Sequence, residues 1–311
     1  MSTNKIGIIG FGSQAKRIIA ILESYKKKIS YIYKKKLIYD KKYNITNDIN
    51  KIHECNTIFI CSPNNTHYEF IKRFHKNHYI FCEKPPVNKI SQLNNLSKIN
   101  MKKVYFNYNY RFSRINESLK KIKKLKFGKM LYGNMIMCHG LATKKEYKDS
   151  WRSKKDKGVY DILAIHLIDL ILNNFKVVEV KKKLSKLISQ NAPDNAYFSI
   201  ILEEIGQIDC FTSYTSPFKQ QFEFIFENGI LEIGKNKIIH RGPRNTLDKN
   251  GFFIKPKIIL EEKFNQLQDY NQSLKESVKF FIKTYDSKNK FSSEKNKISL
   301  LSNKLLLKNS L

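Results

Sequence analysis

A glycine turn between an apolar run and an amphipathic segment constrains the fold of this chain more than any other feature. The apolar run covers residues 5–10 (KIGIIG). Residues 14–25 then carry apolar side chains at the i, i+3, i+4, i+7 spacing of a helix packed on a sheet. Residues 29–33 form a second β-rich run. Together these segments predict a strand, a helix and a strand within about thirty residues, which is the length of a βαβ unit.

The glycines of this turn fit the phosphate-binding sequence GxGxxA. Gly10 permits the tight turn from strand to helix, and Gly12 lets the backbone approach a pyrophosphate. Ala15 is small enough for close packing of helix on strand. The N–H groups at the helix start, around Ser13 and Gln14, would face the phosphates. GxGxxA can arise by chance, but its place between a strand and an amphipathic helix predicts a dinucleotide-binding site.

The rest of the N-terminal third continues this pattern. Strands are predicted at residues 58–61 and 79–82, and the polar or proline-rich turns at residues 62–65 and 84–86 close them. Strands that alternate with helices over short connections indicate a parallel, doubly wound sheet.

Beyond residue 104 the pattern changes. Longer β-rich runs follow one another with hairpin-like breaks between them, at residues 131–138, 196–202, 207–214 and 222–226. Helices are predicted near residues 161–173 and 271–285. We therefore predict an α/β fold with two domains. Residues 1–107 form a Rossmann domain with a doubly wound parallel sheet, and residues 108–311 form an α+β domain with an open, mostly antiparallel sheet.

The net charge of +31 comes almost entirely from lysine, because only seven of the 58 basic residues are arginine. The lysines are spread over most of the chain, which is typical of a solvated surface set by composition. A nucleic-acid binder more often gathers its charge on one face and uses arginine for phosphates. Polyanion binding stays open as an alternative, and a positive surface would also attract an anionic substrate.

Several classes of protein find no support in the sequence. The five cysteines are odd in number and lack CxxC spacing, so we expect reduced thiols, a cytoplasmic protein and no metal site. No apolar run approaches the roughly 20 residues of a membrane span, and no GxSxG sequence supports hydrolase chemistry. We expect a small-molecule substrate, with neither nucleic acid nor a membrane as partner.

The end of the second predicted strand bears on the choice of cofactor. An acid there normally holds the ribose hydroxyls of NAD. This chain instead has Tyr33 followed by Lys34, Lys35 and Lys36. Cations suit a ribose 2′-phosphate, so the predicted cofactor is NAD(P) with a preference for NADP. The alternative is that these lysines only reflect the composition of the chain.

The order and spacing of seven short motifs resemble the glucose-fructose oxidoreductase / inositol dehydrogenase (Gfo/Idh/MocA) family over nearly the whole chain. The motifs are IGIIGFGSQA at residues 6–15, CSPNNTH at 61–67, EKP at 83–85, YNYRF at 108–112, WR at 151–152, GV at 158–159 and HLIDL at 166–170. The resemblance implies a Rossmann domain followed by an open-sheet domain. It also implies a homodimer or homotetramer that assembles through the far face of that sheet.

The resemblance also assigns roles to individual residues. It places the side chain of Lys84 near the substrate hydroxyl and the nicotinamide, and it implies a cis bond between Lys84 and Pro85. It makes His166 the acid/base. It adds cofactor contacts from two segments, at Ser62, Pro63, Asn64, His67 and Glu83.

One position departs from the family pattern. Family members usually carry an aspartate four residues before the histidine, where this chain has Ile162, and Asp161 lies five residues before His166. On a regular helix a residue five positions away turns off the shared face. Asp161 is therefore a candidate only if the backbone there is irregular. Asp169 shares the face of His166 and could orient the imidazole or hold a sugar hydroxyl.

These features predict an NAD(P)-dependent oxidoreductase. Hydride would pass between the nicotinamide and a hydroxyl-bearing carbon of a sugar or nucleotide-sugar, as in surface-polysaccharide metabolism. His166 would move the hydroxyl proton, and Lys84 would polarise the oxygen or share the transfer. The first alternative is a cofactor-binding sensor or scaffold without activity, because the usual aspartate position holds Ile162. The second is a polyanion-binding protein.

Overall fold

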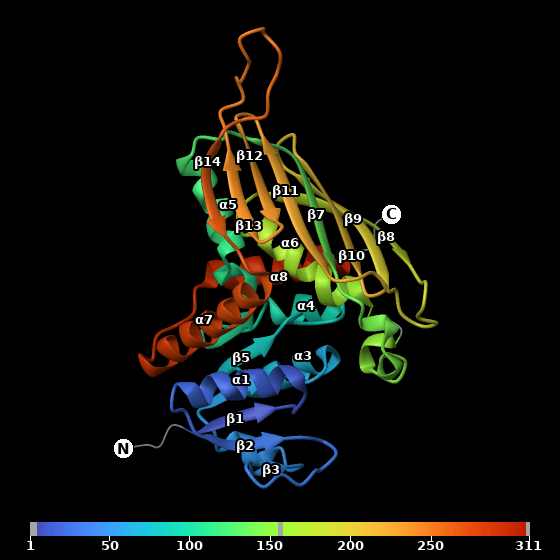
Figure 1. Ribbon diagram of the computed structural model, residues 1–311. Helices are drawn as coiled ribbons and strands as arrows, with labels where there is room; N and C mark the ends of the chain where they lie inside the picture. Colours follow the sequence, from blue (N-terminus) through green and yellow to red (C-terminus); the bar gives the residue numbers. More distant parts are fainter. Residues whose placement is uncertain (1–4, 155–157, 309–311) are drawn as a thin grey trace. The chain divides into compact units, whose positions relative to one another are not determined.

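The computed structural model describes residues 5–154 and 158–308, and the chain forms two compact units (Figure 1). The first unit runs as far as Asn109 and also includes Leu274–Leu307, whereas Tyr110–Ser273 forms the second. The border at residue 109 lies close to the expected boundary at residue 107. Residues 274–307, which we expected in the second domain, instead pack in the first unit.

The first unit contains a six-stranded, fully parallel sheet in the order β3-β2-β1-β4-β5-β6. The strands are β1 (Ile6–Ile9), β2 (Ile29–Tyr33), β3 (Ile45–Thr46), β4 (Thr57–Ile60), β5 (Tyr79–Glu83) and β6 (Val104–Asn107). The helices are α1 (Ser13–Ser24), α2 (Asn50–His53), η1 (Asn64–Thr66), α3 (His67–Phe74), α4 (Ile90–Leu96) and α8 (Ser293–Leu307), with the second part of α7 (Gln266–Asp286). This arrangement confirms the predicted Rossmann architecture.

The predicted spacing of apolar residues in α1 accounts for its packing. The side chains that recur at this spacing, Ala15, Ile18, Ile19 and Leu22, are all buried. Every residue of β1 and β4 is buried as well. Strands covered on both faces need continuous apolar sequence, because helices of the crossover connections lie over each side of a parallel sheet.

The C-terminal segment joins the first unit through its aromatic residues. The ring of Phe281 in α7 lies 5.1 Å from that of Phe59 and 5.4 Å from that of Phe81. Phe291 stacks on Phe281 at 5.5 Å. Since Phe59, Phe81 and Phe281 are fully buried, these contacts explain why residues 274–307 return to the first unit rather than staying with the second.

The second unit contains an eight-stranded sheet in the order β14-β13-β12-β11-β7-β10-β9-β8. All neighbours are antiparallel except β7 and β10, which run parallel, so the prediction of a mostly antiparallel sheet is confirmed. The strands are β7 (Met130–Cys138), β8 (Val177–Ser185), β9 (Asn195–Leu202), β10 (Gln207–Ser213), β11 (Lys219–Phe226), β12 (Gly229–Gly234), β13 (Lys237–Arg241) and β14 (Ile258–Lys263). Its helical segments are η2 (Asn109–Phe112), α5 (Arg114–Lys124), η3 (Leu141–Thr143), η4 (Lys145–Tyr147), η5 (Trp151–Ser153), η6 (Tyr160–Ala164) and α6 (Ile165–Leu172), and α7 begins here.

One face of this sheet is covered by helical segments of the same unit, and the other face is open. The strand register aligns three rows of open-face residues across β9, β10, β7, β11 and β12. The rows are Tyr197, Phe211, Ile136, Gln221 and Gly234; Ser199, Asp209, Asn134, Glu223 and Glu232; and Ile201, Gln207, Tyr132, Ile225 and Ile230. We call these fifteen residues the open face.

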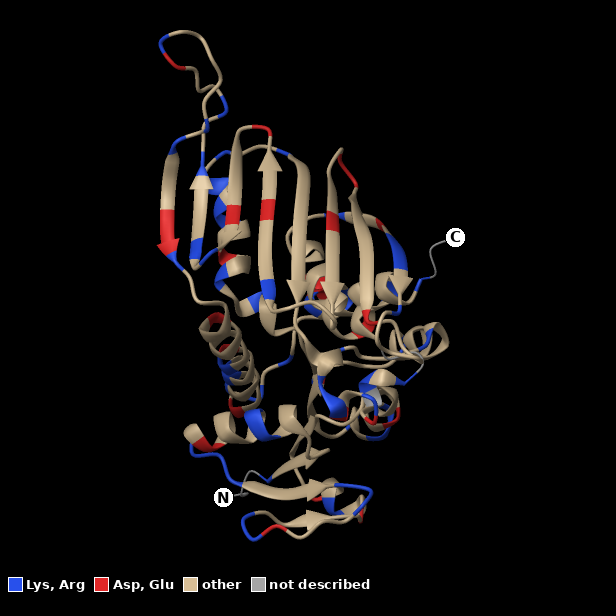
Figure 2. Cartoon of the chain, turned by 45° about the vertical axis from the view of Figure 1, so that its right-hand side comes forward, with Lys and Arg blue, Asp and Glu red and all other residues tan. Residues whose placement is uncertain are grey.

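The open face differs from the rest of this basic protein. None of these fifteen residues is lysine, although lysine makes up about one residue in six of the chain; the same rows continue to Lys181 and Lys183 on β8 and to Lys237 on β13. Figure 2 shows acidic bands near the middle of several strands, while lysine and arginine gather on helices, loops and the outer strands. Within the described ranges, no helix is long and apolar enough to cross a membrane.

Candidate functional site

The glycine turn follows β1 and opens α1. Gly10 has a φ of +96°, which favours glycine, and its N–H donates to the carbonyl of Tyr33 at 2.9 Å. A Cβ at Gly10 would lie 2.8 Å from the backbone nitrogen of Ser62. A Cβ at Gly12, by contrast, would meet none of the described atoms within 4 Å. The fold thus requires glycine at position 10, and beside Gly12 it leaves the space that the predicted pyrophosphate needs.

The N-terminus of α1 is suited to an anion. Gly12 is its N-cap, and within the described residues neither a side-chain cap nor an acidic residue occupies its first turn, which begins with Ser13 and Gln14. The first N–H groups of a helix have no partner within the helix, and the helix dipole adds positive potential there. The chain's own residues therefore fit the phosphates of a dinucleotide at this turn.

The end of β2 carries the lysines that the sequence singled out. Lys34 is half-buried and pairs through its N–H with the carbonyl of Thr46 at 2.9 Å, while Lys35 and Lys36 are exposed. The next acid along the chain, Asp40, accepts hydrogen bonds from the N–H groups of residues 42 and 43. Its carboxylate is therefore engaged within its own loop.

The loop after β4 is held to the end of β5 by His67. The imidazole is fully buried, with Nε2 2.9 Å from the carbonyl oxygen of Ser62 and Nδ1 2.8 Å from that of Pro85. Pro63 precedes η1, where Asn64 is buried. His67 thus joins two loops at the carboxyl edge of the sheet, and the effect of this contact is to fix the loops in position.

Lys84 follows β5, and its bond to Pro85 is cis, as predicted. The preceding residue, Glu83, is buried, and its carboxylate accepts hydrogen bonds from the side-chain amides of Gln14 (3.0 Å) and Asn107 (2.7 Å). Burial raises the pKa of Glu83, whereas those two hydrogen bonds and the charge of Lys84 oppose the rise. The predicted cofactor contact Glu83 therefore links the helix after the glycine turn to the strand that carries Lys84.

This network continues into the C-terminal segment. The hydroxyl of Ser277 donates to Asn107 Oδ1 at 2.6 Å and lies 2.6 Å from the hydroxyl of Tyr105. Both Asn107 and Ser277 are buried. Because the members occupy α1, β5, β6 and α7, the network fixes the position of Glu83, in β5, with respect to three other elements of the first unit.

His166 lies in the second unit, near the start of α6. Its side chain is 7% exposed, and its ring lies 5.1 Å from the ring of Tyr110. Burial raises the pKa of Tyr110, so this phenol stays protonated at neutral pH. The aromatic contact restricts the orientation of the imidazole.

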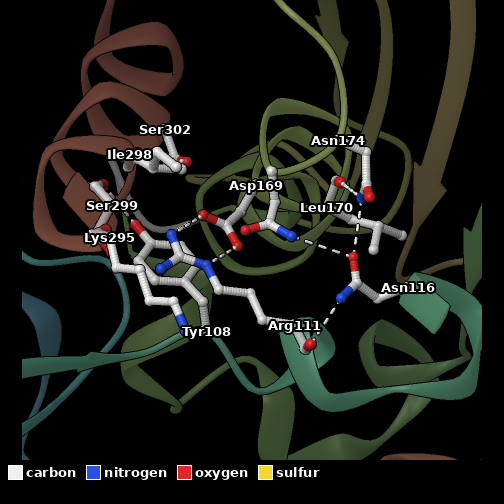
Figure 3. A network of polar contacts seen from close by, with 11 residues as sticks. Tyr108, Arg111, Asn116, Asp169, Leu170, Asn174, Lys295, Ile298, Ser299 and Ser302 are labelled. Carbon is white, nitrogen blue, oxygen red and sulfur yellow. Dashed lines mark hydrogen bonds and ion pairs between the residues drawn. The ribbon is translucent and has the colours of Figure 1, made fainter. Parts of the chain in front are cut away.

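Asp169 lies one helical turn after His166 and forms a buried ion pair (Figure 3). Its two carboxylate oxygens accept hydrogen bonds from Arg111 Nε at 2.9 Å and Nη2 at 2.5 Å, and the carboxylate is 1% exposed. The backbone carbonyl of Arg111 accepts in turn from Asn116 Nδ2 at 2.7 Å. A bidentate pair of this kind fixes both partners. Asp169 is thus placed to position the helix of His166.

The helix before His166 is irregular. Residues Tyr160–Ala164 form a π-helix, and regular α-helix begins at Ile165. In a π-helix the hydrogen bonds join residues five apart, whereas in an α-helix they join residues four apart. The backbone at Asp161 is therefore irregular. This is the condition under which Asp161 was a candidate.

Asp161 also lies in a charged and aromatic environment within the second unit. Its charge acts on Lys182, whose Nζ lies 4.7 Å from the ring centroid of Tyr160. Burial lowers the pKa of Lys182, and the nearby Asp161 opposes that change. Asp161 influences the buried phenol of Tyr214 as well. The charge of Asp161 therefore acts on other titratable side chains of its unit.

Sequence reasoning quoted the YNYRF motif without giving roles to its members. The structure shows that Arg111 binds Asp169 and that Tyr110 packs on His166. The sequence also did not predict the hydrogen bond from the side-chain amide of Asn107 to the carboxylate of Glu83. The only signal in the sequence was the position of these residues within or next to a motif, since each contact spans 24 residues or more of the chain.

Comparison with known proteins agrees with this geometry. Residues 4–105 match the family described as "Oxidoreductase family, NAD-binding Rossmann fold" (Gfo/Idh/MocA). Residues 4–105 are therefore similar to this oxidoreductase family. The match covers the glycine turn, the loop after β4 and Lys84, so the first unit is an NAD-binding Rossmann domain. No curated protein sequence matches the chain.

Solved structures extend the likeness in fold to nearly the whole chain. A myo-inositol dehydrogenase from Corynebacterium glutamicum is 16% identical, with 98% of this chain and 94% of that chain covered and a TM-score of 0.73. A levoglucosan dehydrogenase in complex with NADH and levoglucosan is 16% identical (97% and 96% covered, TM-score 0.74). An oxidoreductase from Agrobacterium radiobacter in complex with NAD+, L-tartaric acid and magnesium is 12% identical (98% and 94%, TM-score 0.76). At these identities the likeness shows the fold.

Proposed function

We propose that this protein is an NAD(P)-dependent dehydrogenase that transfers hydride between nicotinamide and a hydroxyl-bearing carbon of a sugar or nucleotide-sugar. The observation that carries the proposal is the pairing, in one Rossmann unit, of an open phosphate turn at Gly12 with Lys84 at the end of β5. The inositol and levoglucosan dehydrogenases of the same fold support a polyhydroxylated substrate. The free cysteines, all buried or partly buried, support a cytoplasmic location.

The direct test is an assay of NAD(P)H formation with inositols, free sugars and nucleotide-linked sugars, and of its consumption with the keto forms. Turnover of at least one of these compounds is expected. Binding of the cofactor without turnover across the whole panel would favour the alternative of a sensor or scaffold.

The mechanism assigns separate tasks to the two units. When bound, the nicotinamide accepts or returns hydride at C4. In the oxidative direction His166 takes the hydroxyl proton from the substrate, and it returns that proton in the reductive direction. The Lys84 ammonium donates a hydrogen bond to the same substrate oxygen and so stabilises the negative charge that develops there. Asp169, held by Arg111, positions the helix of His166.

Glu83 is proposed to keep Lys84 protonated. Its buried carboxylate is fixed by Gln14 and Asn107 and lies next to Lys84 in sequence. The other titratable groups that act on it are the thiols of residues 61 and 82, which are neutral because burial raises their pKa well above 9.0. A fixed negative charge favours the ammonium form of a neighbouring lysine.

We expect Glu83→Gln to shift the alkaline limb of the pH profile of kcat to lower pH. Removal of the carboxylate lowers the pKa of Lys84, so the donor is lost earlier as the pH rises. Glutamine preserves the size of the side chain and its acceptor oxygen. Glu69→Gln, on the surface of α3, is the control and should leave the profile unchanged. An alkaline limb at the same pH in Glu83→Gln would contradict the role of Glu83.

The cofactor preference rests on the end of β2. We propose that Lys34, with Lys35 and Lys36 beside it, attracts a ribose 2′-phosphate, because the nearest following acid is engaged within its own loop. NADP should then bind on the order of tenfold more tightly than NAD, the effect of one charge-assisted contact. Lys34→Asp should remove or invert that ratio without changing kcat. Equal affinity for both cofactors at low salt in the unaltered protein would contradict this.

Asp161 is proposed to share the proton transfer with His166 across the π turn. We expect Asp161→Asn to lower kcat by about 100-fold, at the low end of general acid–base effects, with little change in cofactor affinity. Asp149→Asn, an exposed aspartate of the same unit, is the matched control and should retain activity. Activity of Asp161→Asn within twofold of the parent would show that the π turn does not replace the usual aspartate.

We further propose a homo-oligomer assembled through the open face. Tyr132 is 39% exposed and Tyr197 is 52% exposed in the single chain, and both lie among aliphatic residues. Exposed aromatic and aliphatic side chains with no lysine among them on the central strands, in a chain with a net charge of +31, fit a surface that is covered by protein. A second copy of this chain is the partner that the fold supports.

A further inference from the structure

The segment between β13 and β14 projects from the second unit. Figure 1 shows that residues 242–257, which we call the arm, extend beyond the ends of the neighbouring strands. The arm is an ordered hairpin: Thr246 and Ile254 exchange hydrogen bonds, and Leu247 forms a bridge with Phe253. Asp248 closes its turn by accepting from the N–H of Phe252. These bonds join the two sides of the arm near its tip.

The arm exposes apolar side chains in this ordered conformation. Phe253 is 90% exposed and Phe252 is 68% exposed, and Leu247 and Ile254 beside them are each about half exposed. Four large apolar residues at the tip of a fixed hairpin are rare on the free surface of a soluble protein, because each leaves apolar area in contact with water. The arm therefore has the character of an interaction surface.

The charged residues of the arm indicate which charge its partner surface should carry. Two of its four cations are engaged at its base, where Lys255 binds Glu232 at 2.7 Å and Arg244 donates to the carbonyl of Glu227. The side chains of Lys249 and Lys257 form no hydrogen bond or ion pair with any described residue. The single acid, Asp248, is engaged in the turn. The exposed part of the arm is thus apolar and positive.

The open face has the complementary character. It presents Tyr132, Tyr197 and Phe211 together with acidic residues of its middle row. Asp209 accepts from neighbouring side chains and Glu232 is paired, but across the described chain no side chain forms a hydrogen bond or ion pair with Glu223. The open face thus presents aromatic side chains and, in Glu223, a carboxylate without a partner among the described residues. The arm presents apolar side chains and two lysines, Lys249 and Lys257, that likewise have no such partner. The two surfaces are therefore complementary.

We propose that the arm of one copy docks on the open face of a second copy of this chain. Phe252 and Phe253 pack against the aromatic residues of that face, and Lys249 or Lys257 pairs with Glu223 of the second copy. The inference rests on the proposal that the chain forms a homo-oligomer through this face, and it names the segment that holds the oligomer together. When the arm of one copy binds the other copy, the lysine-rich surfaces of the two copies need not come into contact, which limits electrostatic repulsion between them.

The first test measures assembly. Light scattering after gel filtration, and sedimentation across a concentration series, should show an oligomer for the full chain. Phe252→Ser with Phe253→Ser should raise its dissociation constant by about 100-fold or more, since buried aromatic anchors dominate interfaces. Tyr39→Ser is the matched control, because Tyr39 is 87% exposed and lies in the first unit. A monomeric parent protein, or an unchanged dissociation constant in the double variant, would overturn the proposal.

The second test exchanges charges and leaves the apolar residues in place. Glu223→Lys alone, and Lys249→Glu with Lys257→Glu, should each weaken assembly, and the combination of all three should restore much of it. Failure of the combination to recover any affinity would contradict the pairing.

Two further measurements separate the alternatives. Vesicles of anionic phospholipid should not bind the parent protein through the arm. Binding to them that the two serine substitutions abolish, with assembly unchanged, would assign the arm to a membrane surface and overturn the proposal. Cofactor binding and turnover are measured on the same samples, so loss of assembly with an intact cofactor site is distinguished from failure of the proposed enzymatic function.

Discussion

Lys84→Met is expected to lower kcat by about 10²–10⁴-fold, the range of a positioned proton donor or electrostatic stabiliser. Methionine is apolar and of similar length, so it removes the ammonium with little change in packing. The side chain follows β5 at the carboxyl edge of the sheet, whereas the proposed site of the cofactor phosphates is the glycine turn after β1. The dissociation constant of the cofactor should therefore change only a few-fold.

Single-turnover and steady-state kinetics, with cofactor binding measured by calorimetry, check this prediction. Lys98→Met, an exposed lysine of the same unit, is the control and should behave as the parent protein. Retention of more than about a tenth of kcat in Lys84→Met would exclude a role for the ammonium in the chemical step.

Gly12→Val is expected to abolish cofactor binding and leave the fold intact. The backbone of Gly12 has an ordinary φ of −89°, and the added side chain would enter space that no described atom occupies. In the proposed complex the pyrophosphate needs that same space. The melting temperature without cofactor should stay within a few degrees of the parent value, while calorimetry should detect no NAD(P) binding.

Gly10→Val provides the contrast. Its backbone has a left-handed φ, and its Cβ would lie within 3 Å of the backbone at Cys61 and Ser62. This substitution should destabilise the first unit by about 2 kcal/mol or more, which thermal unfolding would measure. Normal cofactor affinity in Gly12→Val would show that the glycine turn is not the phosphate site.

Much of the first unit was predictable because its signals are local. The spacing of Ala15, Ile18, Ile19 and Leu22 marked the buried face of α1, and the structure confirms that face. The apolar runs at β1, β4 and β5 and the turns after them fixed the carboxyl edge of the sheet. Gly10, Gly12 and Lys84 follow these strands, so their common edge is a consequence of parallel topology.

Other features depended on contacts that sequence reasoning could not supply. The helical pattern near residues 271–285 was correctly predicted, but an amphipathic helix does not state which sheet it covers. The packing of Phe281 on Phe59 and Phe81 decided that residues 274–307 belong to the first unit. The arm was likewise invisible, because an exposed phenylalanine and a buried one look the same in the sequence.

The sequence by itself determined the class of the chain: a glycine fingerprint, strands alternating with helices, and a set of motifs in a specific order. Tertiary structure decided what the individual residues do. Asp169 was named for its spacing from His166, but Arg111, 58 residues earlier, decides that its carboxylate is held in an ion pair. Asp161, five residues before His166, lies in a π turn, an irregularity that the sequence did not reveal. The physical reason is the same in both cases, since periodicity and turn chemistry act over a few residues, whereas side-chain partners and backbone irregularities are selected by packing between segments far apart in the chain.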